Sequence, residues 1–371
     1  MMVDTALVPV TADDLKSLAL GVGILGTGGG THPYLELLNL EKLYRAGRSV
    51  SLLLPDALAD DDLVAEVGFM GAPLVTKERL PDPEQVLKAF RTMQRFAGCQ
   101  FRAVMTSEVG GENGLMPFFV AAEMGIPVLD ADPRGRAFPE MQMSSFAIAG
   151  LPLHPVALAD IRGNEAIILR TQTAKWTERI GRQICTEVGS MLATCRPPRT
   201  GRQIRAHALH GSVSRAIRLG AAVRRARSAH ADPAEAVLLA EPGIRLFAGK
   251  VVDVARRTTA GFVRGEARIE GLESDAGRLF KVDFQNEFTV GWIDGDLVAV
   301  VPDLICILDA LSGEAIGTET IRYGQRVAIL SLPASELLTS ERALSVVGPR
   351  AFGYDLDFIS PHKRQAADER R

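Results

Sequence analysis

The sequence has few cysteines, few aromatic residues and no long apolar run. Its 371 residues include four cysteines, and only 6% are Phe, Trp or Tyr. The cysteines are scattered without a Cys-x-x-Cys pair, which indicates reduced, mostly buried thiols and not zinc ligands or disulfides. No apolar run approaches the roughly 18 residues that a membrane span needs, and the first residues lack the basic and apolar stretches of a signal peptide. We therefore expect a cytoplasmic protein with no membrane partner.

A large excess of charge of either sign is also missing. The chain has 42 Lys and Arg against 45 Asp and Glu, a net charge of −3, so composition predicts no nucleic-acid partner. One segment departs from this balance, because nine arginines and no acid lie between Arg196 and Arg227. This segment is either a surface for phosphate, nucleic acid or a docking partner, or a solvated helix face that balances acids elsewhere. We favour the second interpretation.

The length predicts about two domains. Residues 1–170 alternate short apolar strands with helices, which predicts an α/β domain built in layers around a mainly parallel sheet. Residues 171–362 begin with two helical stretches, about 174–195 and 212–227. Beyond Pro242 they change to the period-two pattern of an all-β domain, a barrel or a sandwich. The polar residues 363–371 predict a frayed tail.

A glycine-rich turn, Gly26-Thr-Gly-Gly-Gly-Thr-His-Pro33, lies between two predicted helices. Its backbone N–H groups precede a helix that starts near Pro33, which is a suitable place for an anion or a developing oxyanion. His32 is a candidate acid, base or ligand. The alternatives are a plain helix–helix turn, with His32 as a turn residue, or a phosphate site. A dinucleotide fingerprint at Gly21-x-Gly23-x-x-Gly26 is disfavoured, because a helix and not a strand precedes it.

Polar residues also follow two predicted strands of the α/β domain. Strand 101–105 leads into Glu108, Gly110, Gly111 and Asn113, and strand 126–129 leads into Asp130, Asp132, Arg134, Arg136 and Glu140. Ligands gather at the carboxyl ends of parallel strands. Alternating aspartates on an extended segment point to the same side, which suits a divalent cation or acid–base chemistry. We expect one shared pocket, and the alternative is a set of capped, charge-neutralised loops.

The β-rich part of the chain has two polar positions of its own. Asn286 and Glu287 stand between aromatic residues, and Asp303 lies in an otherwise apolar stretch. A buried acid is costly unless it meets a partner or a ligand. These residues therefore belong either to turns satisfied by backbone N–H groups or to a cleft between the domains.

Six ordered motifs extend over nearly the whole chain. They are Leu25-Gly-Thr-Gly-Gly-Gly30, Glu108-x-Gly-Gly-x-Asn113, Asp130-Ala-Asp-x-x-Gly-Arg-Ala-Phe-Pro-Glu140, Gln285-Asn286-Glu287, Pro302-Asp303-Leu304-Ile305 and Gly348-Pro349-Arg350-Ala-Phe-Gly353. Together they resemble the bacterial and archaeal family named for S-methyl thiohydantoin desulfurase, formerly a domain of unknown function. This sequence departs from the family pattern at Thr31-His32-Pro33, where many members have another glycine and an acidic or polar residue.

This resemblance implies a two-domain protein associated with hydantoinase and oxoprolinase systems, which open cyclic ureides and lactams. The leading hypothesis is a hydrolase in which Glu108, Asp130 or Asp132 activates water, with or without a divalent metal held by the two aspartates. The amides of Gly28, Gly29, Gly30 and Thr31 would stabilise the oxyanion, and Arg134 or Arg136 would orient the substrate. Gly110, Gly111, Asn113, Glu140, Asn286, Glu287 and Asp303 complete the expected substrate site.

The competing hypothesis is a non-catalytic assembly subunit of a hydantoinase-like complex. In that case the glycine turn would hold an anion or the backbone of a partner, and the arginine-rich segment would be a docking face. In either case a homo-oligomer is expected.

Overall fold

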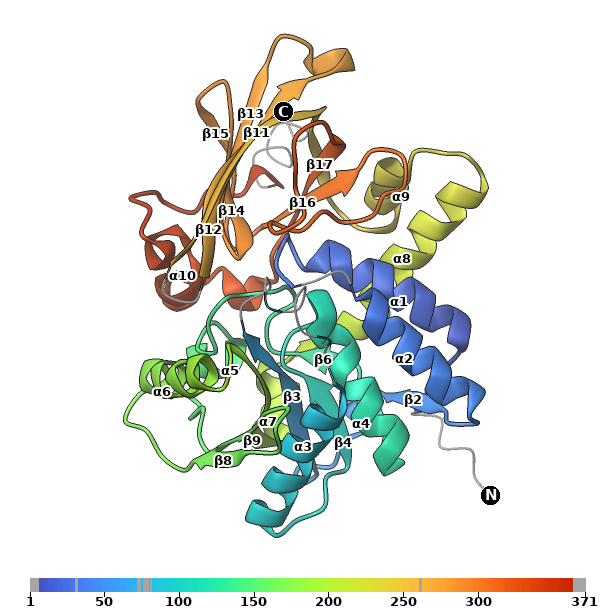
Figure 1. The fold of residues 1–371 in the computed structure, drawn as a ribbon, viewed down its shortest axis with the longest axis vertical. Helices are drawn as coiled ribbons and strands as arrows, with labels where there is room; N and C mark the ends of the chain where they lie inside the picture. The colour runs from blue at the N-terminus through green and yellow to red at the C-terminus, as the bar shows by residue number, and fades with distance from the viewer. Residues whose placement is uncertain are drawn as a thin grey trace.

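The computed structural model describes residues 7–30, 33–71, 75, 80, 82–259 and 262–362. Figure 1 shows an α/β part below and a β-rich part above, with helices α1 and α8 beside the junction. The mixed fold class with an all-β second part is confirmed. The expected tail at residues 363–371 lies outside the described residues.

The first sheet has eight strands in the order β1-β2-β5-β4-β3-β9-β7-β8. Its central pairs, β2–β5, β5–β4 and β4–β3, are parallel, as the alternation of strands and helices predicts, and the outer pairs are antiparallel. Helices α3 and α4 pack in the apolar core on one face, and α6 packs on the other. The strands are β1 (Leu7–Val10), β2 (Val50–Leu53), β3 (Leu63–Gly71), β4 (Ala103–Thr106), β5 (Val128–Leu129), β7 (Val156–Ala159), β8 (Glu165–Ile168) and β9 (Met191–Thr200).

Ten helices accompany the two sheets in the described part of the chain. They are α1 (Ala12–Leu25), α2 (Tyr34–Arg45), α3 (Glu84–Ala97), α4 (Met116–Met124), α5 (Ser145–Ile148), α6 (Ala174–Glu187), α7 (Gly201–His207), α8 (Ser212–Ser228), α9 (Pro233–Ala240) and α10 (Glu341–Val347). Two short strands, β6 (Ala131–Asp132) and β10 (Leu209–His210), pair with each other beside the first sheet.

The second sheet is antiparallel throughout, with the order β15-β14-β13-β12-β11-β17-β16. Strand β16 also contacts β14 and β15 at the far edge, so the sheet curls into a half-barrel around its own apolar core. Its strands are β11 (Ile244–Thr259), β12 (Phe262–Gly271), β13 (Leu279–Gln285), β14 (Glu287–Ile293), β15 (Asp296–Val300), β16 (Leu304–Asp309) and β17 (Arg326–Leu332).

The predicted helix over residues 174–195 is wrong in its second half. Helix α6 ends at Glu187, the chain turns at Gly189 with φ +98°, and residues from Met191 onward form strand β9. This strand pairs with β3 and with β7, in the middle of the first sheet. The helix therefore ends before residues that pair with distant strands, and the local sequence does not reveal such long-range pairing.

The arginine-rich segment is largely tied to acids of the same chain. Arg196 and Arg199 lie on β9 and are buried, which contradicts the expectation of a solvated helix face at these two positions. Six others form ion pairs, as the interpretation of balanced charge predicts. They are Arg202 and Arg205 with Asp60, Arg215 and Arg218 with Glu241, Arg224 with Asp13, and Arg227 with Glu314.

The motif Gly21-x-Gly23-x-x-Gly26 lies in and just after helix α1 and does not follow a strand. A Cβ at Gly21 would come within 1.8 Å of the carbonyl oxygen of Ala216 on α8, and a Cβ at Gly220 within 1.7 Å of the Ser17 carbonyl. These glycines let two helix backbones touch, which explains their presence without a nucleotide.

Two expected absences can be examined in the described part of the chain. The four cysteines are free thiols, three of them buried. None of the helices that the structure describes is long and apolar enough to cross a membrane.

Candidate functional site

Segments far apart in the sequence meet at one cavity of about 70 Å³ at the junction of the two parts. The glycine turn contributes Gly30, and the turn between β13 and β14 contributes Asn286 and Glu287. The loops after β4 and β6 supply Glu108, Gly110, Glu112, Asn113, Arg134, Phe138, Pro139, Glu140 and Met141. The structure thus brings together eight of the residues that the sequence marks as candidates.

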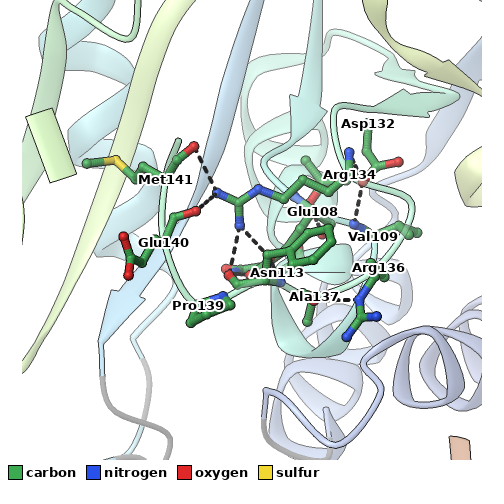
Figure 2. A network of polar contacts seen from close by, with 12 residues as sticks. Glu108, Val109, Asn113, Asp132, Arg134, Arg136, Ala137, Pro139, Glu140 and Met141 are labelled. Carbon is green, nitrogen blue, oxygen red and sulfur yellow. Dashed lines mark hydrogen bonds and ion pairs between the residues drawn. The ribbon is translucent and has the colours of Figure 1, made fainter. Parts of the chain in front are cut away.

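Glu108 is the centre of the polar network at this cavity (Figure 2). Its Oε2 accepts from Arg134 Nη1 at 2.6 Å and from the Phe138 backbone N–H at 3.0 Å. Its Oε1 accepts from Asn113 Nδ2 at 2.7 Å. Asn113 in turn accepts from the Phe69 N–H at 2.6 Å, which ties the loop to strand β3. Three donors therefore hold the Glu108 carboxylate in position.

Arg134 is almost fully buried and holds the loop over the cavity in shape. Besides Glu108, its guanidinium donates to the carbonyl oxygens of Phe138, Glu140 and Met141 at 3.1 to 3.3 Å. Figure 2 shows the guanidinium between the Glu140–Met141 backbone and Glu108. Its Nε is buried without a hydrogen-bond partner among the described residues.

The two alternating aspartates face different partners. Asp130 Oδ1 accepts from the backbone N–H groups of Val213 at 2.9 Å and Ser214 at 3.0 Å, and so caps helix α8. Asp132 accepts from the N–H groups of Val109, Arg134 and Gly135 at 2.8 to 3.1 Å. Burial raises the pKa of Asp132 to about 6. Neither aspartate lines the cavity.

A metal site at these aspartates does not fit the donor set. Among the described residues, no group of three or more His, Cys, Asp or Glu side chains could hold a metal ion. The oxygens of Asp130 and Asp132 already accept backbone N–H groups from different segments.

The glycine turn joins the two parts of the molecule. The carbonyls of Thr27 and Gly28 accept from the N–H groups of Phe288 and Thr318 at 2.8 and 2.9 Å. The N–H groups of Gly26, Thr27 and Gly29 donate to carbonyls of α1 and of the turn itself, so they are not the open amides that the sequence suggested. Gly28 and Gly29 line a neighbouring cavity, and only Gly30 lines both cavities.

Three loops approach one another so closely at the cavity that only glycine fits at the contact positions. A Cβ at Gly30 would lie 2.9 Å from the Gly111 Cα, and both residues have positive φ. A Cβ at Gly110 would lie 2.5 Å from the Ala137 nitrogen. The glycines thus let three loops touch at the cavity. Thr31 and His32, which the sequence marked as candidates, lie outside the described residues.

Glu287 enters the cavity from the β-rich part. The chain reverses at Asn286, which has φ 59° and is held against β12 by two hydrogen bonds with Val263 of 2.7 and 2.9 Å. Glu287 is 4% exposed, and burial together with the nearby Glu108 charge raises its pKa to about 8. Its Oε2 has no hydrogen-bond partner among the described residues. It is thus a protonated acid at neutral pH.

Arg136 and Asp303 do not line this cavity. Arg136 donates to the carbonyls of Pro302 and Asp303 at 2.9 and 2.8 Å and to Thr27 Oγ1 at 2.8 Å, so it links the two parts. Figure 2 shows it pointing away from Arg134. The Asp303 carboxylate accepts from the Ala334 N–H and from Ser360 Oγ, and does not line the cavity.

Sequence reasoning missed several lining residues. Arg182 and Arg196 reach the cavity from α6 and β9, where they pair with Glu178 and Glu66. An apolar wall is formed by Phe69, Met70, Met141 and Met191. Glu66, a carboxylate inside the apolar stretch of strand β3, was a signal that a buried cation must lie opposite. The methionines belong to no motif.

Comparisons with known proteins agree with this architecture. A crystal structure of a protein from Chromobacterium violaceum has a TM-score of 0.80 at 24% identity, over 95% of this chain and 99% of that chain, which shows a shared fold. No curated protein matches the chain. The family model "S-Me-THD-like, N-terminal domain" matches residues 13–170, and "S-Me-THD-like, C-terminal domain" matches residues 172–361. The chain therefore belongs to the S-Me-THD-like family, that of S-methyl thiohydantoin desulfurase.

Proposed function

We propose that this chain is a hydrolase of hydantoin-like rings, which replaces the methylthio group of an S-methyl thiohydantoin with oxygen from water. The observation that carries the proposal is the cavity where the fixed Glu108–Arg134 pair and the buried Glu287 carboxyl line one space. Paired acidic groups in different environments are a common basis of acid–base hydrolysis. Family membership supplies the substrate class.

The lining of the cavity suits such a ring. A volume of about 70 Å³ favours a compact molecule over a nucleotide, since pockets for drug-sized ligands measure roughly 300–1,000 Å³. The sulfur atoms of Met70, Met141 and Met191 offer a polarizable surface for a methylthio group. Arg134 Nε and Arg196 Nε are buried N–H groups without a hydrogen-bond partner among the described residues, and either could donate to the ring carbonyl oxygen.

The test is an assay on S-methyl thiohydantoins in water enriched in ¹⁸O. We expect one equivalent of methanethiol per hydantoin, with the label in the new carbonyl group. Glu108→Gln should lower kcat/KM at least about 100-fold, because the network that shapes the cavity loses its charge. Glu270→Gln, at an exposed carboxyl on β12, is the matched control. Absence of both methanethiol release and ligand binding in the wild-type chain would refute the proposal.

A further inference from the structure

We infer that Glu287 is the proton donor of the reaction and that Glu108, whose two oxygens are already bonded, is not. The inference rests on the proposed function and assigns the roles of two carboxyl groups within it. It rests on the geometry of the β13–β14 turn, on burial and on the unequal bonding of the two groups.

The turn delivers Glu287 to the cavity and holds it there. Asn286 adopts a left-handed conformation, and its carbonyl accepts from Thr318 Oγ1 at 2.6 Å. The next residue but one, Phe288, donates its N–H to Thr27 on the glycine turn. A Cβ at Gly29 would lie 2.2 Å from Glu287 Oε1, so glycine at this position leaves the room that the carboxyl occupies.

The charged groups around Glu287 act in opposite directions. Burial is the main reason that its pKa rises to about 8, and Glu108 adds to the rise, whereas Arg136 and Arg134 oppose it. Arg134 forms an ion pair of 2.6 Å with Glu108, and Arg136 donates hydrogen bonds to backbone carbonyls of the β-rich part. The other charged groups that line the cavity are Glu112, Glu140, Arg182 and Arg196.

Glu108 is the poorer candidate for proton transfer. Both of its oxygens already accept hydrogen bonds, from Arg134, Asn113 and the Phe138 N–H. A proton placed on it would break that network. Glu287 Oε2, by contrast, has no hydrogen-bond partner among the described residues. A group that titrates near neutral pH is best suited to move protons.

The reaction balances with Glu287 as the only proton carrier. In an S-methyl thiohydantoin, one ring carbon is bonded to sulfur and doubly bonded to a ring nitrogen. Glu287 gives its proton to that nitrogen while the oxygen of water bonds to the carbon, and the carboxylate takes one proton from the water. Glu287 then protonates the sulfur as the carbon–sulfur bond breaks. The hydroxyl proton returns to Glu287, leaving a carbonyl group and methanethiol.

The experiment compares the wild-type chain with Glu287→Gln, Glu287→Asp, Glu108→Gln and Glu270→Gln. Measured kcat/KM against pH should fall above about pH 8 in the wild type, where Glu287 loses its proton. Glu287→Gln should lose about 100-fold or more in kcat and lose that limb of the profile. Glu287→Asp should keep the limb at reduced kcat, and Glu108→Gln should move it to lower pH.

A second measurement does not depend on turnover. Infrared difference spectra should show a carboxylic acid band that disappears as the pH rises through about 8 and that is absent in Glu287→Gln. Glu36, whose pKa burial raises to about 7, gives a separate band that disappears at lower pH in both proteins. Thermal melting verifies that each variant is folded, and calorimetry with a hydantoin should show that Glu287→Gln still binds it.

The outcomes separate the two proposals. A wild-type chain that neither binds nor hydrolyses S-methyl thiohydantoins refutes the proposed function. Normal wild-type turnover with an unchanged kcat and pH profile in Glu287→Gln refutes only the role of Glu287. A carboxylic acid band that still titrates near pH 8 in Glu287→Gln likewise overturns the assignment of the stored proton to this residue.

Discussion

The cavity has two walls of opposite character. The wall from the α/β part is a closed network, in which Glu108 accepts from three donors and the four Nη contacts of Arg134 end on an acid or on backbone carbonyls. The wall from the β-rich part presents Glu287, a buried carboxyl with an oxygen that accepts no hydrogen bond among the described residues. The carboxylate of the first wall thus has both oxygens bonded, whereas the carboxyl of the second has an oxygen without a hydrogen-bond partner among the described residues.

This difference assigns different functions to the two walls: the network around Glu108 holds the shape of the cavity, and Glu287 transfers the proton. A satisfied network keeps its geometry and stabilises a fixed charge. A buried acid that lacks partners costs folding free energy, and such a cost is typical of functional sites. The charge fixed on the first wall also raises the pKa of the acid on the second, so the two walls operate as a unit.

The largest expected effect comes from breaking the satisfied wall. Arg134→Met leaves Glu108 buried without its cation at 2.6 Å, and we expect a loss of about 3–5 kcal/mol in the free energy of unfolding. Urea denaturation measures it. The double variant Arg134→Met with Glu108→Gln should recover part of this loss, because the uncompensated charge is gone. A loss below about 1 kcal/mol for Arg134→Met would show that the network does not hold this wall together.

Much of this arrangement could be predicted from the sequence. Alternating strands and helices, followed by period-two strands, predicted both sheets, and the polar residues at strand ends predicted that Glu108, Asn113 and Arg134 share a pocket. The sequence left open whether Glu287 lies in a satisfied turn or in a cleft between the domains. The partners of each carboxyl could not be predicted. Asp130 and Asp132 are only two residues apart on an extended segment, yet Asp130 accepts a hydrogen bond from an N–H of α8 and Asp132 accepts one from an N–H of the loop after β4.

The failures have the same physical cause. Strand β9 and the buried Arg196 depend on pairing with β3, which lies more than a hundred residues earlier in the chain. Likewise, the N–H groups of Gly26, Thr27 and Gly29 looked available in the sequence because their acceptors, in α1 and at Gly26, are set by the folded backbone. Local patterns locate polar residues well, but they do not say whether a group is already satisfied.

A prediction of intermediate size concerns the buried Glu287 carboxyl and the pH dependence of the free energy of unfolding. Its pKa is about 8 in the folded chain and about 4.3 in an unfolded one, so the folded state binds the proton more tightly. The contribution of Glu287 to stability is therefore complete below about pH 4, is lost as the pH rises to about 8, and changes no further above it.

Glu287→Gln removes this titration. Between pH 5 and pH 7 its stability relative to the wild type should rise by about 1.4 kcal/mol per pH unit, on the order of 3 kcal/mol in all. Unfolding at a series of pH values measures the difference, with Glu270→Gln as the control. A difference that does not change with pH would mean that Glu287 is ionised in the folded chain like any surface carboxyl.

The smallest expected effect concerns Asp130, which lies outside both walls. Asp130→Asn removes a charged cap from α8 but keeps an oxygen that can accept from the Val213 and Ser214 N–H groups. We expect a loss of about 1 kcal/mol in the free energy of unfolding and kcat/KM within about twofold of wild type. Denaturation and the methanethiol assay on the same preparation give both numbers. If kcat/KM instead falls as far as in Glu287→Gln while stability is unchanged, Asp130 takes part in the reaction. The assignment of the chemistry to the two walls alone would then be wrong.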